Sequence, residues 1–184
     1  MPLIPTLAGT RVRLRALRTD DADALWLLHG DPEVMRYWSH PPWQERAQAL
    51  AHIERMQRER RHTEFYPWAA TLDDDVLVGT CSLFALSRDH ARAELGYALR
   101  PAYWRQGLAT QMLTLALGHA FTALGLLRIE ADVDPLNLAS CRLLERLGFV
   151  REGLLRERWR VGGATQDSAL YGLLARDWRA PSRP

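Results

Sequence analysis

The sequence reads Arg100-Pro101-Ala102-Tyr103-Trp104-Arg105-Gln106-Gly107-Leu108-Ala109-Thr110 at the point where a predicted strand ends and a long predicted helix begins. The strand covers residues 93–99, and Pro101 marks its end because proline has no N–H to donate to a neighbouring strand. Apolar residues then recur with the helical period over residues 108–124. We therefore expect a sharp turn between the strand and the helix.

This turn has the features of an anion site. The first turn of a helix leaves N–H groups without intrahelical partners, and the aligned peptide dipoles make that end partly positive. Gly107 has no Cβ to keep a phosphate from these amides, and Arg105 adds positive charge. On this stretch alone, an ordinary strand-to-helix turn is the competing interpretation. The sequence contains neither G-x-x-x-x-G-K-[ST] nor G-x-G-x-x-G, which argues against a P-loop or a dinucleotide-binding turn.

Length and composition indicate an ordinary globular protein. The 184 residues, with 24 basic and 22 acidic side chains and a net charge of +2, are expected to form one domain over residues 1–184. Every basic side chain other than histidine is arginine. Because the net charge is small and no long basic run occurs, we expect no nucleic-acid partner.

The termini and the cysteines bear on location and metal binding. Residues 1–6 lack a basic n-region and an apolar h-region, and no apolar run is long enough for a membrane span, so we expect a cytoplasmic protein without a membrane partner. Cys81 and Cys141 form no C-x-x-C pair and are expected to be reduced core residues. The six histidines show no metal-ligand spacing, so no metal site is expected.

Hydrophobic periodicity predicts the order of elements along the chain. The predicted strands are residues 11–16, 67–72, 76–86, 93–99, 128–133, 150–161 and 164–174, and the predicted helices begin at Thr19, Gln44, Leu108 and Asn137. In the first strand the three arginines share one exposed face, and residues 33–43 are expected to form a loop. The strands on either side of the long helix are expected to be parallel neighbours in a βαβ unit. Gly162-Gly163 predicts the turn of the final hairpin.

Two motifs carry a family resemblance. Trp104-Arg105-Gln106-Gly107-Leu108-Ala109 resembles the [QR]-x-x-G-x-[GA] loop of the GNAT (GCN5-related) N-acetyltransferases, except that tryptophan stands at its first position, a variant of the RimJ/RimL-like branch. Asn137-Leu138-Ala139-Ser140 followed by Leu144-Glu145-Arg146-Leu147-Gly148-Phe149 resembles the family's N-x-x-S and L-E-x-x-G-F segments. The resemblance covers about residues 11–178.

The resemblance implies a fold and a co-substrate. The implied fold is mixed α/β, with a mostly antiparallel twisted sheet of about seven strands, about four flanking helices, and a central parallel pair splayed around a cleft for acetyl-CoA. In the family, the pyrophosphate lies on the helix start and the pantetheine along the strand edge. The residues expected to bind acetyl-CoA are Tyr97, Ala98, Leu99, Arg100, Trp104, Arg105, Gln106, Gly107, Leu108, Ala109, Thr110, Asn137 and Ser140.

Acetyl transfer to an amine needs a base, an oxyanion site and a proton for the leaving thiolate. Glu94 is the candidate base, and a solvated strand residue is the alternative. Ser140 is the candidate for the thiolate, and a capping or packing role is the alternative. Backbone N–H groups near residues 97–99 are candidate oxyanion donors if Gly96 forms a bulge. The strand position at which RimL-like proteins carry a carboxylate corresponds to Trp159, so that role has no assigned residue.

The acceptor side is expected among aromatic residues. Tyr37, Trp38 and Trp43 are the candidates for an acceptor pocket, because an apolar wall with a few polar groups suits a small or peptide ligand. The leading acceptor is a protein or peptide N-terminal amine, and a small-molecule amine such as a polyamine, an amino acid or an aminoglycoside is the alternative. A regulatory module that binds acyl-CoA without catalysis is a further alternative. A homodimer is compatible with the sequence.

Overall fold

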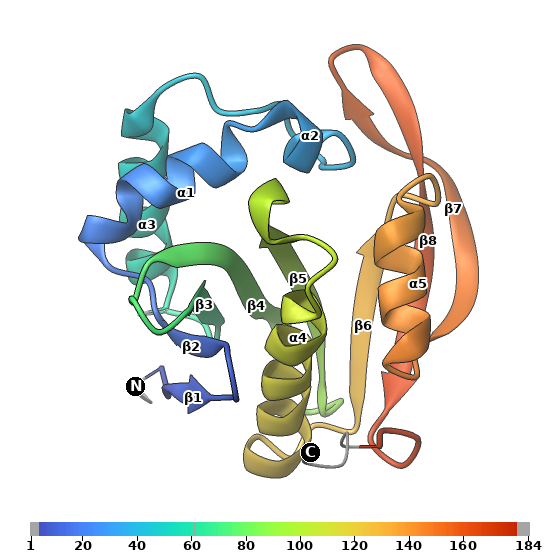
Figure 1. Cartoon of the computed structure of the whole chain (residues 1–184). Coiled ribbons are helices and arrows are strands. Elements are labelled where there is room, and N and C mark those ends of the chain that lie inside the picture. The colour runs from blue at the N-terminus through green and yellow to red at the C-terminus, as the bar shows by residue number, and fades with distance from the viewer. Residues whose placement is uncertain (1–3, 61, 180–184) are drawn as a thin grey trace.

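A mixed eight-stranded sheet forms the centre of the computed structural model, which describes residues 4–60 and 62–179 (Figure 1). The strand order is β1-β2-β3-β4-β5-β6-β8-β7, and only β5 and β6 are parallel neighbours. The strands are β1 Leu7–Ala8, β2 Arg13–Ala16, β3 Tyr66–Thr71, β4 Leu77–Ser87, β5 Arg92–Leu99, β6 Arg128–Val133, β7 Val150–Val161 and β8 Ala164–Leu174.

Helices cover both faces of the sheet. They are α1 Ala22–His29, which follows a 3₁₀ turn over Thr19–Asp21, then α2 Pro32–Met35, α3 Arg46–Glu59, α4 Leu108–Gly118 and α5 Leu138–Arg146. Neighbouring residues of β3 point to opposite faces. Ala69 belongs to the apolar cluster that includes α1 and α3, and Trp68 belongs to the cluster that includes α4 and α5. The sheet therefore separates two apolar clusters, one under each pair of helices.

The parallel pair separates partway along its length. Pairing between β5 and β6 ends at Glu94 opposite Glu130, although β5 continues to Leu99 and β6 to Val133. Beyond this point β6 keeps its pairing with β8 and β5 keeps its pairing with β4. The two strands accordingly diverge toward the α2 side of the molecule (Figure 1). The predicted splayed parallel pair is confirmed.

The predicted elements differ from the structure in three places. The described residues form eight strands instead of about seven, because the short β1 pairs with β2 through Leu7 and Leu14. The segment expected to be a loop begins with helix α2, because the Asp31 carboxylate accepts the Glu33 N–H at 2.8 Å and caps the helix. The long helix ends in a π-helical segment over His119–Ala123.

No helix in the described part of the chain is long and apolar enough to cross a bilayer.

The prediction that Arg15 shares an exposed face with its neighbouring arginines is wrong. Arg15 is 5% exposed, and its guanidinium donates two hydrogen bonds of 2.8 Å to the Asp21 carboxylate. Its Nε also donates to Asp75 Oδ1 at 2.7 Å. These contacts join β2, the turn before α1 and the β3–β4 turn, so one buried charge network holds together three segments that are separate in the sequence.

We expect Arg15→Ala to lower the free energy of unfolding by about 3–5 kcal/mol, because it leaves the Asp21 carboxylate buried without its counter-charge. Chemical denaturation measures the change. Arg13→Ala, on the same strand at an exposed position, is the matched control and is expected to cost much less. Equal losses in the two variants would contradict a structural role for the buried pair.

Candidate active site

The diverging strands border a cavity of about 720 Å³ that has residues from both faces of the sheet in its wall. Glu94, Gly96 and Tyr97 of β5 and Asp132 of β6 form its middle. Ser140 and Asn137 close it on the α5 side, and the α2–α3 loop, α3, β4 and the β7–β8 hairpin surround its other end. We call the part between residues 95–99 and residues 131–133 the interstrand opening.

Glu94 faces the α1 and α3 side of the opening. It lies four residues before Ala98, which packs in the α1–α3 cluster, and residues an even number apart on a strand share a face. Burial, followed by the nearby carboxylates of Glu130 and Asp132, raises the pKa of Glu94 above its ordinary value. No described residue donates a hydrogen bond to this carboxylate or forms an ion pair with it. Glu94 is therefore an unpaired, half-buried carboxylate with a tendency to take up a proton.

Tyr97 and Ser140 meet on the opposite side of the opening. Their hydroxyl oxygens are 2.6 Å apart, and either group can be the donor. Burial raises the pKa of Tyr97, so its hydroxyl stays protonated at neutral pH. Ser140 is held in place at the start of α5, where its N–H donates to Asn137 Oδ1 at 3.1 Å. Asn137 is thus the N-cap of α5. The Tyr97–Ser140 pair places a hydroxyl proton at the opening.

Backbone N–H groups also point into the opening. The Arg100 N–H donates to the Val78 carbonyl on β4 at 2.9 Å. Because N–H directions alternate along a strand, the N–H groups of Tyr97 and Leu99 point to the other edge, toward the opening. The expected bulge at Gly96 does not occur: Gly96 pairs regularly with Ser82, and the register shifts between Phe84 and Ser87. The donors are exposed because β6 moves away, and no bulge in β5 is needed.

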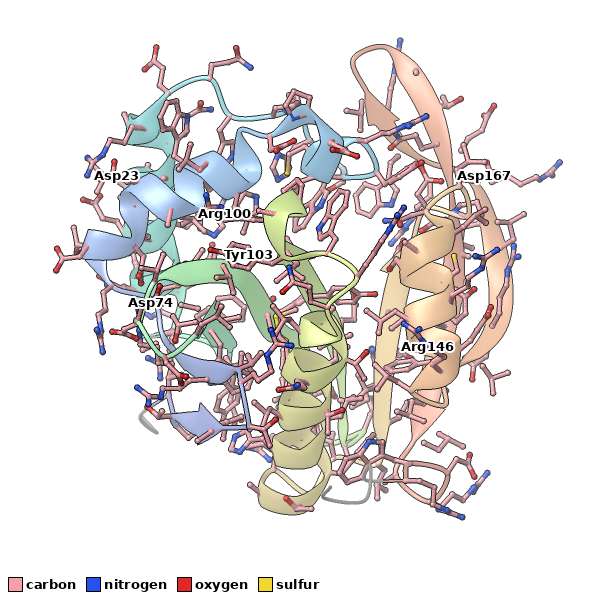
Figure 2. All side chains as sticks on the ribbon, in the orientation of Figure 1. Asp23, Asp74, Arg100, Tyr103, Arg146 and Asp167 are labelled. Atoms are coloured by element: carbon pink, nitrogen blue, oxygen red, sulfur yellow. The ribbon has the colours of Figure 1, made fainter. Side chains whose placement is uncertain are left out.

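The turn after β5 is held in shape by its own side chains. Trp104 donates its indole N–H to the Leu99 carbonyl at 2.7 Å, so the tryptophan fixes the turn to the end of the strand. Gln106 donates to the Ala102 carbonyl at 3.0 Å, and the guanidinium of Arg100 lies 5.8 Å from the centre of the Tyr103 ring (Figure 2).

The helix start beyond this turn is open to a ligand. Arg105 and Gly107 have positive φ values of 58° and 76°, and the first intrahelical hydrogen bond runs from the Gln111 N–H to the Gly107 carbonyl. The N–H groups of the first turn of α4, at residues 108–110, are left without helix partners. A Cβ at Gly107 would meet nothing within 4 Å. Arg105 is exposed beside this space, so the loop fits a phosphate group in charge and shape.

The aromatic residues divide into two layers. Tyr37 and Trp38 line the cavity, whereas Trp43 stacks on the ring of His29 with 4.4 Å between centroids and is not part of the lining. His29 and His52 form part of the wall, a role that the sequence analysis missed. Burial lowers the pKa of His29 to about 3, and burial together with Arg55 lowers that of His52 to about 4. Both rings are therefore uncharged at neutral pH.

A carboxylate does lie beside Trp159, but it comes from another strand. Asp132 of β6 lies 3.7 Å from the Arg158 guanidinium, and the Trp159 indole also stabilises its charge. Burial outweighs both effects and raises the pKa of Asp132. Glu152, one of the nearest acids in sequence, instead pairs with Arg128. The alternation of Glu130-Ala131-Asp132, combined with the parallel register, was the sequence signal for this second acid.

The comparisons with known proteins agree with this architecture. The family model described as "Acetyltransferase (GNAT) domain" matches residues 11–150. The chain belongs to the GNAT acetyltransferase family. The Bacillus subtilis (strain 168) protein "Uncharacterized N-acetyltransferase YoaA" is 33% identical over 173 residues, covering 94% of this chain and 98% of its own length. The N-acetyltransferase names among its relatives identify the chain as an acetyl-CoA-dependent N-acetyltransferase of this family.

Two further relatives carry different names. The solved structure of Mycobacterium smegmatis RimJ in complex with CoA-disulfide has a TM-score of 0.82 and 28% identity, covering 94% of this GNAT chain and 88% of RimJ. The Escherichia coli (strain K12) spermidine N(1)-acetyltransferase is 28% identical over 152 residues, covering 83% of this chain and 80% of its own length. The RimJ/RimL-like resemblance is confirmed at the level of the family branch. The names of the relatives include both a "Putative ribosomal N-acetyltransferase" and a spermidine N(1)-acetyltransferase, so they do not determine the acceptor of this chain.

We expect Gly107→Val to weaken acetyl-CoA binding at least about tenfold, because the new side chain would project into the open space over the helix start. Gly125→Val is the matched control: Gly125 also has a positive φ, of 66°, and open space around its Cβ, so it carries similar backbone strain away from the loop. Isothermal titration of both folded variants measures the affinity. Equal dissociation constants for the two variants would contradict the phosphate assignment.

Proposed function

We propose that the acetyl group passes from acetyl-CoA, through the interstrand opening, to the N-terminal amine of a peptide or protein. The observation that carries this proposal is the placement of an unpaired carboxylate, Glu94, on one side of the opening and the Tyr97–Ser140 hydroxyl pair on the other. A donor thioester that lies between them has a proton acceptor on the amine side and a proton donor on the sulfur side.

In the proposed reaction, one proton is removed on the amine side of the opening and one is supplied on the sulfur side. Glu94 takes one proton from the acceptor ammonium, and the neutral amine attacks the thioester carbonyl carbon. The N–H groups of Tyr97 and Leu99 stabilise the resulting oxyanion. The carbon–sulfur bond then breaks, an amide forms, and the thiolate takes a proton from the Tyr97–Ser140 pair. The attacking nitrogen carries two protons in the tetrahedral intermediate: one is lost to solvent and the other stays as the N–H of the neutral amide. Solvent then returns a proton to the Tyr97–Ser140 pair and takes the proton from Glu94, so one proton is released overall.

The rest of the donor is assigned to the start of α4. The N–H groups of residues 108–110, the open space at Gly107 and the charge of Arg105 support binding of the pyrophosphate there. Asn137 and Ser140 are assigned to the pantetheine end, because both line the cavity. Arg100, Trp104 and Gln106 act by holding the turn, since their side chains contact neighbouring parts of the same loop or strand.

The chemistry of the amine supports an N-terminal acceptor. An α-amino group has a reference pKa of about 7.7–8.0, against about 10.4 for a lysine side chain, so a weak carboxylate base suffices. The likeness to RimJ supports the same class. A small-molecule amine is the second candidate, supported by the likeness to a spermidine N(1)-acetyltransferase. Release of thiol from acetyl-CoA, measured across a panel of peptides and small amines, tests both. Binding of acetyl-CoA without thiol release for any amine would contradict the proposal.

We expect Glu94→Gln to lower kcat/KM by about 10²–10⁴-fold near neutral pH, because the amide keeps the shape of the site and cannot accept a proton. The raised pKa of Glu94 means that the parent gains activity as pH rises and the carboxylate ionises. The activity of the variant does not show this rise. It increases only at alkaline pH, where the amine arrives deprotonated. Pre-steady-state or steady-state rates across the pH range measure the difference.

Ser140→Ala is the comparison for this experiment. It removes a hydroxyl on the sulfur side, so its loss of kcat is not rescued by deprotonating the amine. Parallel pH profiles for parent and Glu94→Gln would remove Glu94 from the role of base.

A further inference from the structure

Most carboxylates of the cavity already have a hydrogen-bond or ion-pair partner. The acidic side chains in its lining are Glu59, Glu64, Glu94, Asp132 and Asp134. Glu64 accepts a hydrogen bond of 2.7 Å from Arg88, and Asp132 lies 3.7 Å from Arg158.

The other two carboxylates away from Glu94 are also engaged. Glu59 lies 3.9 Å from Arg55 on the exposed side of α3. Asp134 accepts the Leu136 N–H at 2.8 Å and shapes the turn before α5. Among the described residues of the lining, Glu94 alone has a carboxylate with no such partner. Glu94 is therefore the carboxylate of the lining that is open to a ligand ammonium without loss of an existing hydrogen bond or ion pair.

Aromatic and apolar side chains form much of the cavity wall, beside charged groups that include Asp132 and Arg158. Phe84 lies directly opposite Glu94 in the β4–β5 register, and it lines the cavity with other rings. The other aromatic side chains of the lining include Tyr37, Trp38, Phe65 and Trp159. His29 and His52 add uncharged rings, so they repel no cation and provide no charge for an anion. Burying an apolar group of the amine against such a wall stabilises the bound state.

We propose that the preferred acceptor is a primary amine with a single positive charge whose nitrogen is attached, within a few bonds, to an aromatic or other apolar group. The inference rests on the proposed function and narrows its acceptor. The amine lies against Glu94, and the apolar group lies against Phe84 and Trp38. A peptide that begins with an apolar residue and a small arylalkylamine share this chemistry.

The same charge balance disfavours a polyamine. Each additional ammonium group that enters the cavity loses its hydration and needs its own negative partner, and a buried charge without a partner is strongly unfavourable. A second ammonium group would have to displace an arginine from Glu64, Asp132 or Glu59, or the Leu136 N–H from Asp134. Breaking any of these contacts weakens the binding of a polyamine. The likeness to spermidine acetyltransferases therefore does not extend to this part of the site.

A panel of three small amines and two peptides tests the inference on the full chain. Phenylethylamine combines one charge with a ring, propylamine has one charge and no ring, and spermidine has several charges and no ring. Two tetrapeptide amides, one starting with phenylalanine and one with serine, form the peptide arm. We expect kcat/KM for phenylethylamine to exceed that for propylamine and for spermidine by about tenfold or more. We expect the peptide that starts with phenylalanine to have a higher kcat/KM than the peptide that starts with serine. Whether the peptides or the small amines react faster identifies the source of the amine.

Arg88→Gln tests the charge balance directly. It removes the guanidinium from the Glu64 carboxylate, which keeps only the neutral Tyr66 hydroxyl as a partner among the hydrogen bonds of the described residues. Arg88 does not line the cavity, so kcat/KM for spermidine is expected to rise about two- to fivefold while that for phenylethylamine stays the same. Arg46→Gln is the matched control, because it breaks an exposed pair with Asp23 outside the cavity and is expected to change neither rate.

The outcomes separate the inference from the function on which it rests. Spermidine acetylated as fast as phenylethylamine, or an unchanged spermidine rate in Arg88→Gln, would overturn the single-charge inference and leave acetyl transfer intact. Equal rates for phenylethylamine and propylamine, and for the two peptides, would overturn the apolar part. No acetylation of any amine in the panel, with acetyl-CoA still bound, would instead overturn the proposed function.

Discussion

Hydrogen bonding between the parallel strands β5 and β6 stops at Glu94 and Glu130, and the arrangement of the site depends on this separation. Parallel strands need a crossover connection, which here includes α4, so the start of α4 necessarily lies just beyond the end of β5. The unpaired strand edge and the partly positive helix start are therefore neighbours by topology. A long ligand with an anionic middle and a reactive end fits such a pair of features.

The separation also gives the two faces of the sheet different chemistry. Side chains alternate along β5, so Glu94 and Tyr97, three residues apart, lie on opposite faces. The hydroxyl of Tyr97 contacts Ser140 on the α5 side, and Glu94 remains unpaired on the α1 and α3 side. Proton uptake and proton release are thus assigned to different sides of one opening. Burial of both groups shifts their pKa values toward the protonated form, which suits a base of moderate strength and a hydroxyl donor.

Local patterns in the sequence were sufficient for the strand-to-helix turn, the parallel pair and the final hairpin at Gly162 and Gly163, because turn residues and periodicity act over short distances. They were insufficient for Arg15, whose burial depends on Asp75, a partner far along the chain. They also left open which face Glu94 occupies, because alternation divides a strand into two sets of residues and tertiary packing decides which set is inside. The contact between Tyr97 and Ser140 likewise appears only when β5 and α5 are brought together.

The most direct measurement of the central claim is a crystal structure of the protein with bound CoA. The account predicts that the CoA sulfur lies in the interstrand opening, within hydrogen-bond reach of the Tyr97–Ser140 pair, and that Glu94 borders the space on the other side. It also predicts that the pyrophosphate lies against the N–H groups of residues 108–110 beside Gly107. A CoA molecule bound with its sulfur outside the opening, or with its pyrophosphate away from the start of α4, would contradict the account.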